Sequence, residues 1–178
     1  MPGFDHLYMY LRPLAFAALL AALTSTTQAA DVMVGRESNT AVRERVVELV
    51  NAARSKRRKC GSERFDAVAP LGASRQLDEA AARHARDMAR KKFFDHRGAD
   101  GSQPKNRVLR AGYDSGLTGE NIAYGPVSAE EVVAGWLASP GHCANIMDAR
   151  FRHIGVGLAT GSKRGEIYWV QTFATPRG

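Results

Sequence analysis

The stretch IYWVQTFA at residues 167–174 constrains the fold most, because apolar side chains fall on both of its faces. A strand that is apolar on both faces belongs inside a sheet rather than at its edge. Before it, apolar residues alternate with small ones over 154–159, and the sequence GSKRG at 161–165 is typical of a hairpin loop. The end of the chain therefore predicts two adjacent antiparallel strands.

Helical patterns come before these strands. Apolar residues recur on one helical face over residues 42–53, and Ser74 is a suitable N-cap for a second helix. A short helix is predicted over 104–111, and a capping box formed by Ser128 and Glu131 opens another. With helices early and strands late, the predicted class is α+β, an antiparallel sheet packed against helices.

Two residues on these helices are expected in the core. Trp136 shares an apolar helical face with Val132 and Val133, so we interpret it as a core residue rather than a platform for a ligand. His84 lies on the apolar face of the second helix. We expect this histidine to be buried and hydrogen-bonded to a neighbour, and a role in a functional site is the alternative.

The first 29 residues have the zones of a signal peptide in the expected order. Arg12 gives a positive start, residues 14–23 form an apolar run, and Thr27 and Ala29 are the small residues before a cleavage site. Ten residues rise only about 15 Å as a helix, half of a bilayer core of about 30 Å, so this run does not predict a membrane span. An uncleaved amphipathic or buried helix is the alternative.

Cleavage after Ala29 divides the chain into a signal peptide over 1–29, a flexible segment over 30–39 and one folded domain over 40–178. The folded part has the length of a typical single domain. We expect a secreted or periplasmic protein without a transmembrane anchor, because no later apolar run is long enough to span a bilayer. No cysteine stands at the cleavage site, which argues against a lipid anchor.

The chain carries a net charge of +7. Its densest basic run, residues 54–59, is interpreted as a solvated helix end, with a specific anion site as the alternative. A basic exported protein is attracted to anionic surfaces such as lipid headgroups or wall polymers. Nucleic acid is not an expected partner, because the sequence has no basic strand with interleaved aromatic residues and the protein is expected to be exported.

The sequence contains two cysteines, Cys60 and Cys143. In an oxidising compartment an isolated pair predicts one disulfide. Such a bridge closes a loop of roughly 80 residues, which chain-entropy reasoning values at about 4–5 kcal/mol. Two free thiols or one metal-bound thiolate are the alternatives.

Three polar residues are not explained by any helical face. They are His96 in a turn, Glu120 beside Gly119, and His142 in the first turn of a helix. Two imidazoles and a carboxylate are what a zinc site with an open position needs, and also what proton transfer needs. The spacings do not identify a metal site by themselves, and a structural hydrogen-bond network that ties three loops to the sheet is the alternative.

Several longer motifs together resemble the bacterial branch of the CAP superfamily. They are FFDH, GSQPKNR, GENIAYG, SAEEVVAGWLASPGHCANIM, FRHIGVGLA and YWVQTFA, spread over residues 42–174. This superfamily groups cysteine-rich secretory proteins, antigen 5 and the plant pathogenesis-related proteins, and its domain is also called the SCP domain. The resemblance implies a three-layer α-β-α sandwich with a central antiparallel sheet.

The resemblance also implies a cavity lined by two histidines and two acidic residues, which binds a divalent metal in some members. Carried over to this sequence, the histidines are His96 and His142, and one acid is Glu120. The second acid falls at Ser139, which is neutral and suited to capping a helix. A divalent metal such as zinc would therefore bind weakly, through the two histidines, and its affinity would fall as the pH drops through about 6.5.

Two functions are compatible with these residues. The preferred hypothesis is an exported binding module whose His/Glu cavity holds a small apolar, lipid or wall-derived ligand, or a partner protein. The alternative is a metal-assisted extracellular hydrolase, in which His96 and His142 bind the metal and Glu120 is the general base or a third ligand. For either function, Asn121 and Gln171 are candidates for fixing the imidazole tautomers.

Overall fold

The computed structural model describes residues 39–163 and 165–178, so the predicted signal peptide and residues 30–38 lie outside the described residues. Within the described part, the central sheet has four strands in the order β3-β5-β6-β4. Their bounds are β3 (Gly72–Ala73), β5 (His153–Thr160), β6 (Ile167–Pro176) and β4 (Ser115–Tyr124). As predicted, β6 is an inner strand, antiparallel to both β5 and β4. The short β3 runs parallel to β5, so the sheet is mixed rather than wholly antiparallel.

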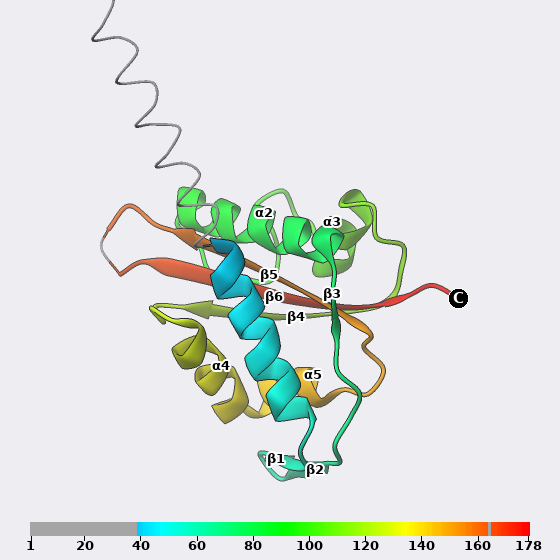
Figure 1. The fold of residues 1–178 in the computed structure, drawn as a ribbon. Helices are drawn as coiled ribbons and strands as arrows, with labels where there is room; N and C mark the ends of the chain where they lie inside the picture. Colours follow the sequence, from blue (N-terminus) through cyan, green and yellow to red (C-terminus); the bar gives the residue numbers. More distant parts are fainter. Residues whose placement is uncertain (1–38, 164) are drawn as a thin grey trace, which may run out of the picture. The chain divides into compact units, whose positions relative to one another are not determined.

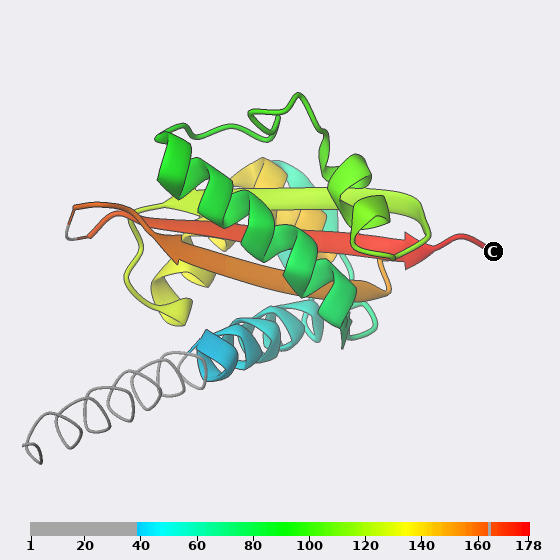
Figure 2. The ribbon, with the colours of Figure 1, turned by 90° about the horizontal axis from the view of Figure 1, so that it is seen from above.

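Helices cover both faces of this sheet (Figures 1 and 2). The helices on one face are α2 (Arg75–Lys91) and α3 (Pro104–Arg110). Those on the other face are a helix over residues 39–54, α4 (Ala129–Ala138) and α5 (Pro140–Met147). The predicted three-layer α-β-α arrangement is confirmed.

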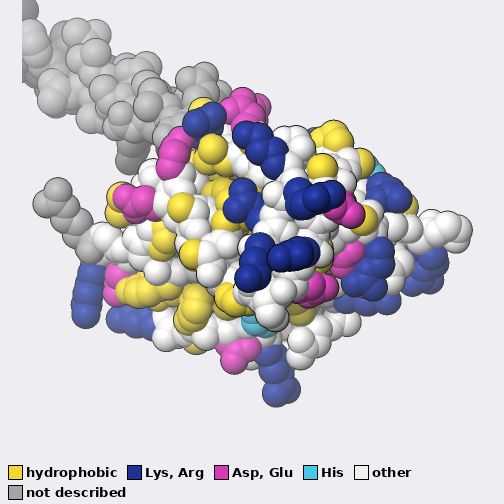
Figure 3. All heavy atoms as spheres, turned by 90° about the horizontal axis from the view of Figure 1, so that it is seen from below, with side chains coloured by type: hydrophobic (Ala, Val, Ile, Leu, Met, Phe, Trp, Pro, Cys, Tyr) yellow, Lys and Arg dark blue, Asp and Glu magenta, His cyan; other side chains and the backbone are white. Residues whose placement is uncertain are grey.

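The face seen from below in Figure 3 has charges of both signs. Lys and Arg side chains gather over its middle and right, with Asp and Glu among them, and hydrophobic side chains gather toward the lower left (Figure 3). In the part of the chain that the structure describes, none of the helices has both the length and the apolar character needed to cross a membrane.

Two glycines on β5 allow α2 to lie directly on the sheet. A Cβ atom at Gly155 would lie 2.2 Å from the carbonyl carbon of Leu77, and one at Gly157 would lie 2.2 Å from the amide nitrogen of Ala82. Both distances are far below van der Waals contact, so the backbones of strand and helix approach each other here. The alternation of small and apolar residues that predicts this strand also determines how closely α2 packs.

The opposite side of β5 and β6 carries the larger hydrophobic cluster. Trp136 on α4 is 1% exposed, which confirms the prediction that it is a core residue, and it shares this cluster with Trp169 and Phe173 of β6. Its indole Nε1 donates to the carbonyl of Ile122 on β4 at 3.3 Å. The ring therefore attaches α4 to the strand that carries Glu120.

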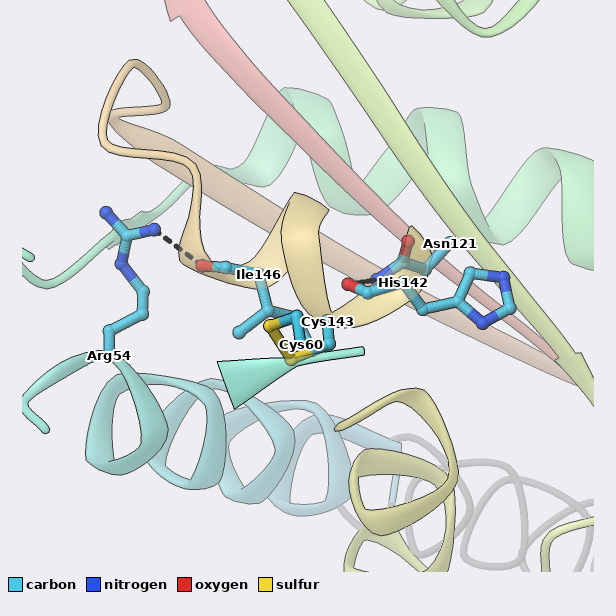
Figure 4. The surroundings of a disulfide bond; sticks show 6 residues. All are labelled: Arg54, Cys60, Asn121, His142, Cys143 and Ile146. Carbon is cyan, nitrogen blue, oxygen red and sulfur yellow. Dashed lines mark hydrogen bonds between the residues drawn. A yellow bond between two sulfur atoms is a disulfide. The ribbon is translucent and has the colours of Figure 1, made fainter. Parts of the chain in front are cut away.

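The interpretation of the basic run as a solvated helix end holds for Lys56, Arg57 and Lys59, which are exposed, but it is wrong for Arg54. This side chain is fully buried, and its guanidinium donates to the main-chain carbonyls of Ala69, Ile146 and Asp148 (Figure 4 shows the bond to Ile146). Burial of a cation is costly unless other polar groups replace the lost water, and here carbonyl groups from two distant segments do so. Arg54 thus joins the first helix to the end of α5.

A hairpin that the sequence did not predict follows this run. It consists of β1 (Arg58–Cys60) and β2 (Glu63–Phe65), which pair antiparallel. Cys60 at its turn is bonded to Cys143 on α5, with Cα atoms 5.5 Å apart, so the predicted disulfide is confirmed (Figure 4). The bridge attaches the hairpin to the helix turn that contains His142.

The predicted helix starts agree largely with the structure. The hydroxyl oxygen of Ser74 accepts from the amide of Leu77, and that of Ser128 accepts from the amide of Glu131. The Glu131 carboxylate, however, accepts from the amide of Val127 at 2.9 Å. The reciprocal bond of the predicted capping box is therefore made one residue before the N-cap.

We predict that Gly157→Ala lowers the free energy of unfolding by at least about 3 kcal/mol, because the new methyl group overlaps the backbone of α2. Gly135→Ala on α4 is the matched control, since a Cβ there meets no atom within 4 Å and alanine is the better helix former by about 1 kcal/mol. Urea unfolding of both variants measures the difference. A Gly157→Ala protein as stable as the parent would contradict the packing described.

Candidate functional site

Glu120 lies at the centre of the candidate site. Successive residues of β4 face opposite sides of the sheet, so Glu120 is on the side of α2 and Asn121 is on the side of α5. The Glu120 side chain is 2% exposed. Its Oε2 accepts from the Arg107 guanidinium at 2.7 Å, and its Oε1 accepts from Nδ1 of His96 at 2.9 Å. Both carboxylate oxygens are therefore engaged inside the protein.

Arg107 is a member of this cluster that sequence reasoning missed. It belongs to α3, is 9% exposed, and also donates to the main-chain carbonyls of Ser102 and His96 at 2.9 Å each. One guanidinium thus links the turn-rich segment 95–102 to β4. Its place in the motif GSQPKNR is the signal that was available, but a basic residue on a short surface helix is ordinarily solvated.

His96 comes from the turn-rich segment and stands over Glu120. Its side chain is 49% exposed, and Nε2 makes no hydrogen bond within the described residues. The hydrogen bond to Glu120 raises the pKa of His96 above its ordinary value, and burial opposes that effect. Because the carboxylate can only accept, Nδ1 carries a proton and Nε2 is the ring atom available to a ligand.

His142 lies in the first turn of α5 (Figure 4). Its imidazole is half-buried and makes no hydrogen bond within the described part of the chain. Partial burial lowers the pKa of His142, and the positive charge of His96 lowers it further. The two imidazoles therefore lie within electrostatic range of each other, although no hydrogen bond joins His142 to Glu120. At neutral pH the ring of His142 is uncharged.

An amide network holds α5 against β4. Asn121 donates through Nδ2 to the main-chain carbonyl of His142 at 3.1 Å and to Oε1 of Gln171 at 2.9 Å (Figure 4 shows the first bond). Asn145 donates to Oδ1 of Asn121 at 2.9 Å and to the carbonyl of Glu120 at 3.3 Å. The prediction that Asn121 and Gln171 fix imidazole tautomers is wrong, because they bind the main chain and each other.

Ser139 occupies the N-cap position of α5, three residues before His142. Its hydroxyl makes no capping hydrogen bond, so the predicted capping role of this side chain is wrong. The helix start is fixed instead by Pro140 at its first position and by the main-chain carbonyl of Ser139, which accepts from the amide of Cys143 at 2.8 Å.

His84 lies nearer to the cluster than the sequence indicated. It is buried, and its Nε2 donates to the carbonyl of Asp95 at 2.9 Å, so the prediction of a buried, hydrogen-bonded histidine is confirmed. The same nitrogen is 4.0 Å from Oε1 of Glu120. Burial lowers the pKa of His84, which favours the neutral ring with its proton on Nε2.

The arrangement does not fit a metal site with three protein ligands. Among the described residues, no group of three or more His, Cys, Asp or Glu side chains is placed to hold a metal ion. In addition, the two oxygens of Glu120 are already bound to Arg107 and His96. This leaves the two imidazoles as the available donors.

These features define a class of disulfide-bonded α-β-α domain, and the family is identified by comparison with known proteins. The family model described as the cysteine-rich secretory protein family, CAP, matches residues 47–173. The chain therefore belongs to the CAP family, and the resemblance found in the sequence is confirmed.

Curated relatives come from Bacillus subtilis (strain 168). The protein YkwD is 35% identical over 157 residues, which cover 88% of this chain and 54% of the relative. The membrane protein YlbC is 35% identical over 80 residues, which cover 45% of this chain and 23% of the relative. The chain thus spans about half the length of the first and under a quarter of the second.

Solved structures show the same fold at low identity. An extracellular protein containing a SCP domain from Bacillus anthracis str. Ames has a TM-score of 0.64 at 24% identity, covering 76% of this chain and 41% of that one. The structure of NaASP2 with zinc has a TM-score of 0.52 at 17% identity, covering 74% and 78%. Both likenesses support the architecture described above.

We predict that the two imidazoles titrate on opposite sides of the ordinary histidine value of about 6.5, His96 above it and His142 below it. Glu120→Gln should lower the pKa of His96, because the hydrogen bond to the carboxylate is what raises it. The His96–Glu120 pair then stabilises the fold below pH about 6.5, and this contribution is lost as the pH rises through the folded pKa of His96.

Proton NMR of the imidazole C–H signals measures both values, and the urea-unfolded chain, in which both should titrate near 6.5, is the control. Coincident titration of His96 and His142 in the folded protein would contradict the geometry of the cluster.

Proposed function

We propose that this chain is an exported binding module whose ligand binds around His96 and His142. Glu120 positions His96 in this surface. Export is supported by the disulfide, by membership in a family of secretory proteins, and by the extracellular relative from Bacillus anthracis. The signal-like pattern over residues 1–29 points the same way.

The observation that carries the proposal is the state of Glu120. Its side chain is buried, and each oxygen has a protein partner, Arg107 for one and His96 for the other. A general base must reach a substrate proton or a water molecule, and this carboxylate is only 2% exposed, with a protein partner at each oxygen. The hydrolase hypothesis is therefore less well supported than binding.

Two imidazoles remain as the groups that meet a ligand. The His96 side chain is 49% exposed, and among the described residues neither its Nε2 nor the ring of His142 has a hydrogen-bond partner. A half-buried neutral imidazole within electrostatic range of a more exposed one can exchange hydrogen bonds with a ligand that is mostly apolar. The proposed ligand is a small apolar, lipid or wall-derived molecule, or a segment of a partner protein.

Zinc remains part of the proposal in a limited form. The NaASP2 structure was solved with zinc, and a histidine that donates one ring N–H to a carboxylate is the usual arrangement around a metal-binding imidazole. An ion held by His96 and His142 would have only two protein ligands. We therefore expect weak binding of zinc, and no reaction step is assigned to it.

The test is native mass spectrometry with elemental analysis of protein purified from the extracellular or periplasmic fraction of its own host. The expected species lacks residues 1–29, keeps its disulfide and carries a small molecule or ion. The double variant His96→Gln/His142→Gln should lose the bound small molecule or ion. His153→Gln should keep it, because His153 is paired with Tyr113 elsewhere in the domain.

Two results would overturn the proposal. One is an uncleaved chain confined to the cell interior. The other is an unchanged load in the protein that lacks both imidazoles.

A further inference from the structure

A hollow of about 750 Å³ lies beside α2, and its lining does not include His96, Glu120 or His142. Its charged lining is mostly positive, with six basic residues against two acids. The basic residues are Arg83, Arg86, Arg90, Lys92, Arg107 and Arg110. Both acids are already paired, Asp87 with Arg90 and Asp100 with Arg110. Arg107 is paired with Glu120, so the excess positive charge of the hollow comes mainly from Arg83, Arg86 and Lys92.

The positive charge continues along the whole of α2. Arg75, Arg83, Arg86 and Arg90 are spaced so that they fall on one side of this helix, opposite its buried residues. A second hollow of about 590 Å³ shares Arg83 and Arg86 with the first and adds two basic residues, Arg43 and Arg75, and two acids, Asp78 and Glu79. Glu79 lies within 3.4 Å of Arg75 and 3.7 Å of Arg83, and the basic residues of the second hollow outnumber its acids by four to two. The two hollows therefore form one cationic track along α2, whose 17 residues span about 25 Å.

Several of these cations are free to bind a partner. Within the described residues, Arg86 and Lys92 make no ion pair or hydrogen bond through their side chains, and Arg83 is only within 3.7 Å of Glu79. A hollow whose charged lining is predominantly of one sign attracts oppositely charged ligands.

We propose that the cationic track binds an anionic polysaccharide outside the cell. Its length favours a polymer over a single anion, and its concave shape favours a chain that enters it over a flat membrane. The hydroxyl-bearing residues Ser102, Thr160 and Ser162 also line the first hollow and provide partners for sugar hydroxyls. The lining contains no Phe, Tyr or Trp, and its one imidazole, His84, is buried, so it offers no stacking platform of the kind that single-stranded nucleic acids use.

The test uses alginate oligomers as the probe, with neutral dextran, duplex DNA and phosphatidylglycerol vesicles as comparisons. Alginate should bind, and binding should weaken as salt rises. Arg83→Gln combined with Arg86→Gln should weaken it roughly tenfold. Lys59→Gln combined with Arg64→Gln is the matched control, because it removes the same charge from facing positions of β1 and β2 and should leave binding nearly unchanged.

Asp87→Asn should increase alginate binding, a result that misfolding of the variant could not produce. It removes a negative charge from the hollow and releases Arg90 and Lys91, so alginate should bind more tightly. The proposal is overturned by any of three results: no alginate binding, equal losses in the two double variants, or tighter binding of DNA or vesicles through the same arginines. Alginate binding by protein that lacks both His96 and His142 side chains would show that this site is separate from the proposed one.

Discussion

The buried charge pair between Glu120 and Arg107 is the interaction on which the candidate site depends. It joins β4 to α3, and through the other bonds of Arg107 it also fixes the segment that carries His96. A carboxylate at this depth without a cation would be strongly destabilising, so each partner requires the other. The bonds to Arg107 and His96 compensate for the burial of the Glu120 carboxylate, and they also occupy its oxygens. We therefore assign Glu120 a positioning role rather than a catalytic one.

The other side of β4 is held by different means. Asn121 and Asn145 connect the strand to α5, the disulfide connects α5 to the β1–β2 hairpin, and Arg54 connects it to the first helix. His142 is therefore placed by rigid neighbours even though its ring has no hydrogen bond of its own among the described residues. The proposed ligand surface therefore contains two histidines that are positioned in different ways. His96 is positioned by the charge network of Glu120 and Arg107. His142 is positioned by the main-chain hydrogen bond to Asn121 and by the neighbouring disulfide.

The fold could be predicted from the sequence because its signals are local. Alternation over β5, apolar residues on both faces of β6 and helical periodicity predicted the α+β class, and the motif resemblance predicted the family and its three layers. The errors concern residues whose state depends on distant partners. Arg54 is buried because carbonyls from α5 surround it, and Asn121 binds main chain because of the face of β4 on which it lies. Arg107 was missed for the same reason, since only the folded chain brings Glu120 to it.

A double-mutant cycle between Glu120 and Arg107 tests the central claim most directly. Urea unfolding of Glu120→Gln, Arg107→Met and the double variant at neutral pH gives the coupling free energy. We predict a coupling of at least about 2 kcal/mol, with the double variant more stable than the sum of the single losses implies, because each single change leaves a buried polar or charged group without its partner. A coupling below about 0.5 kcal/mol would contradict the assignment of Glu120 to a structural charge pair.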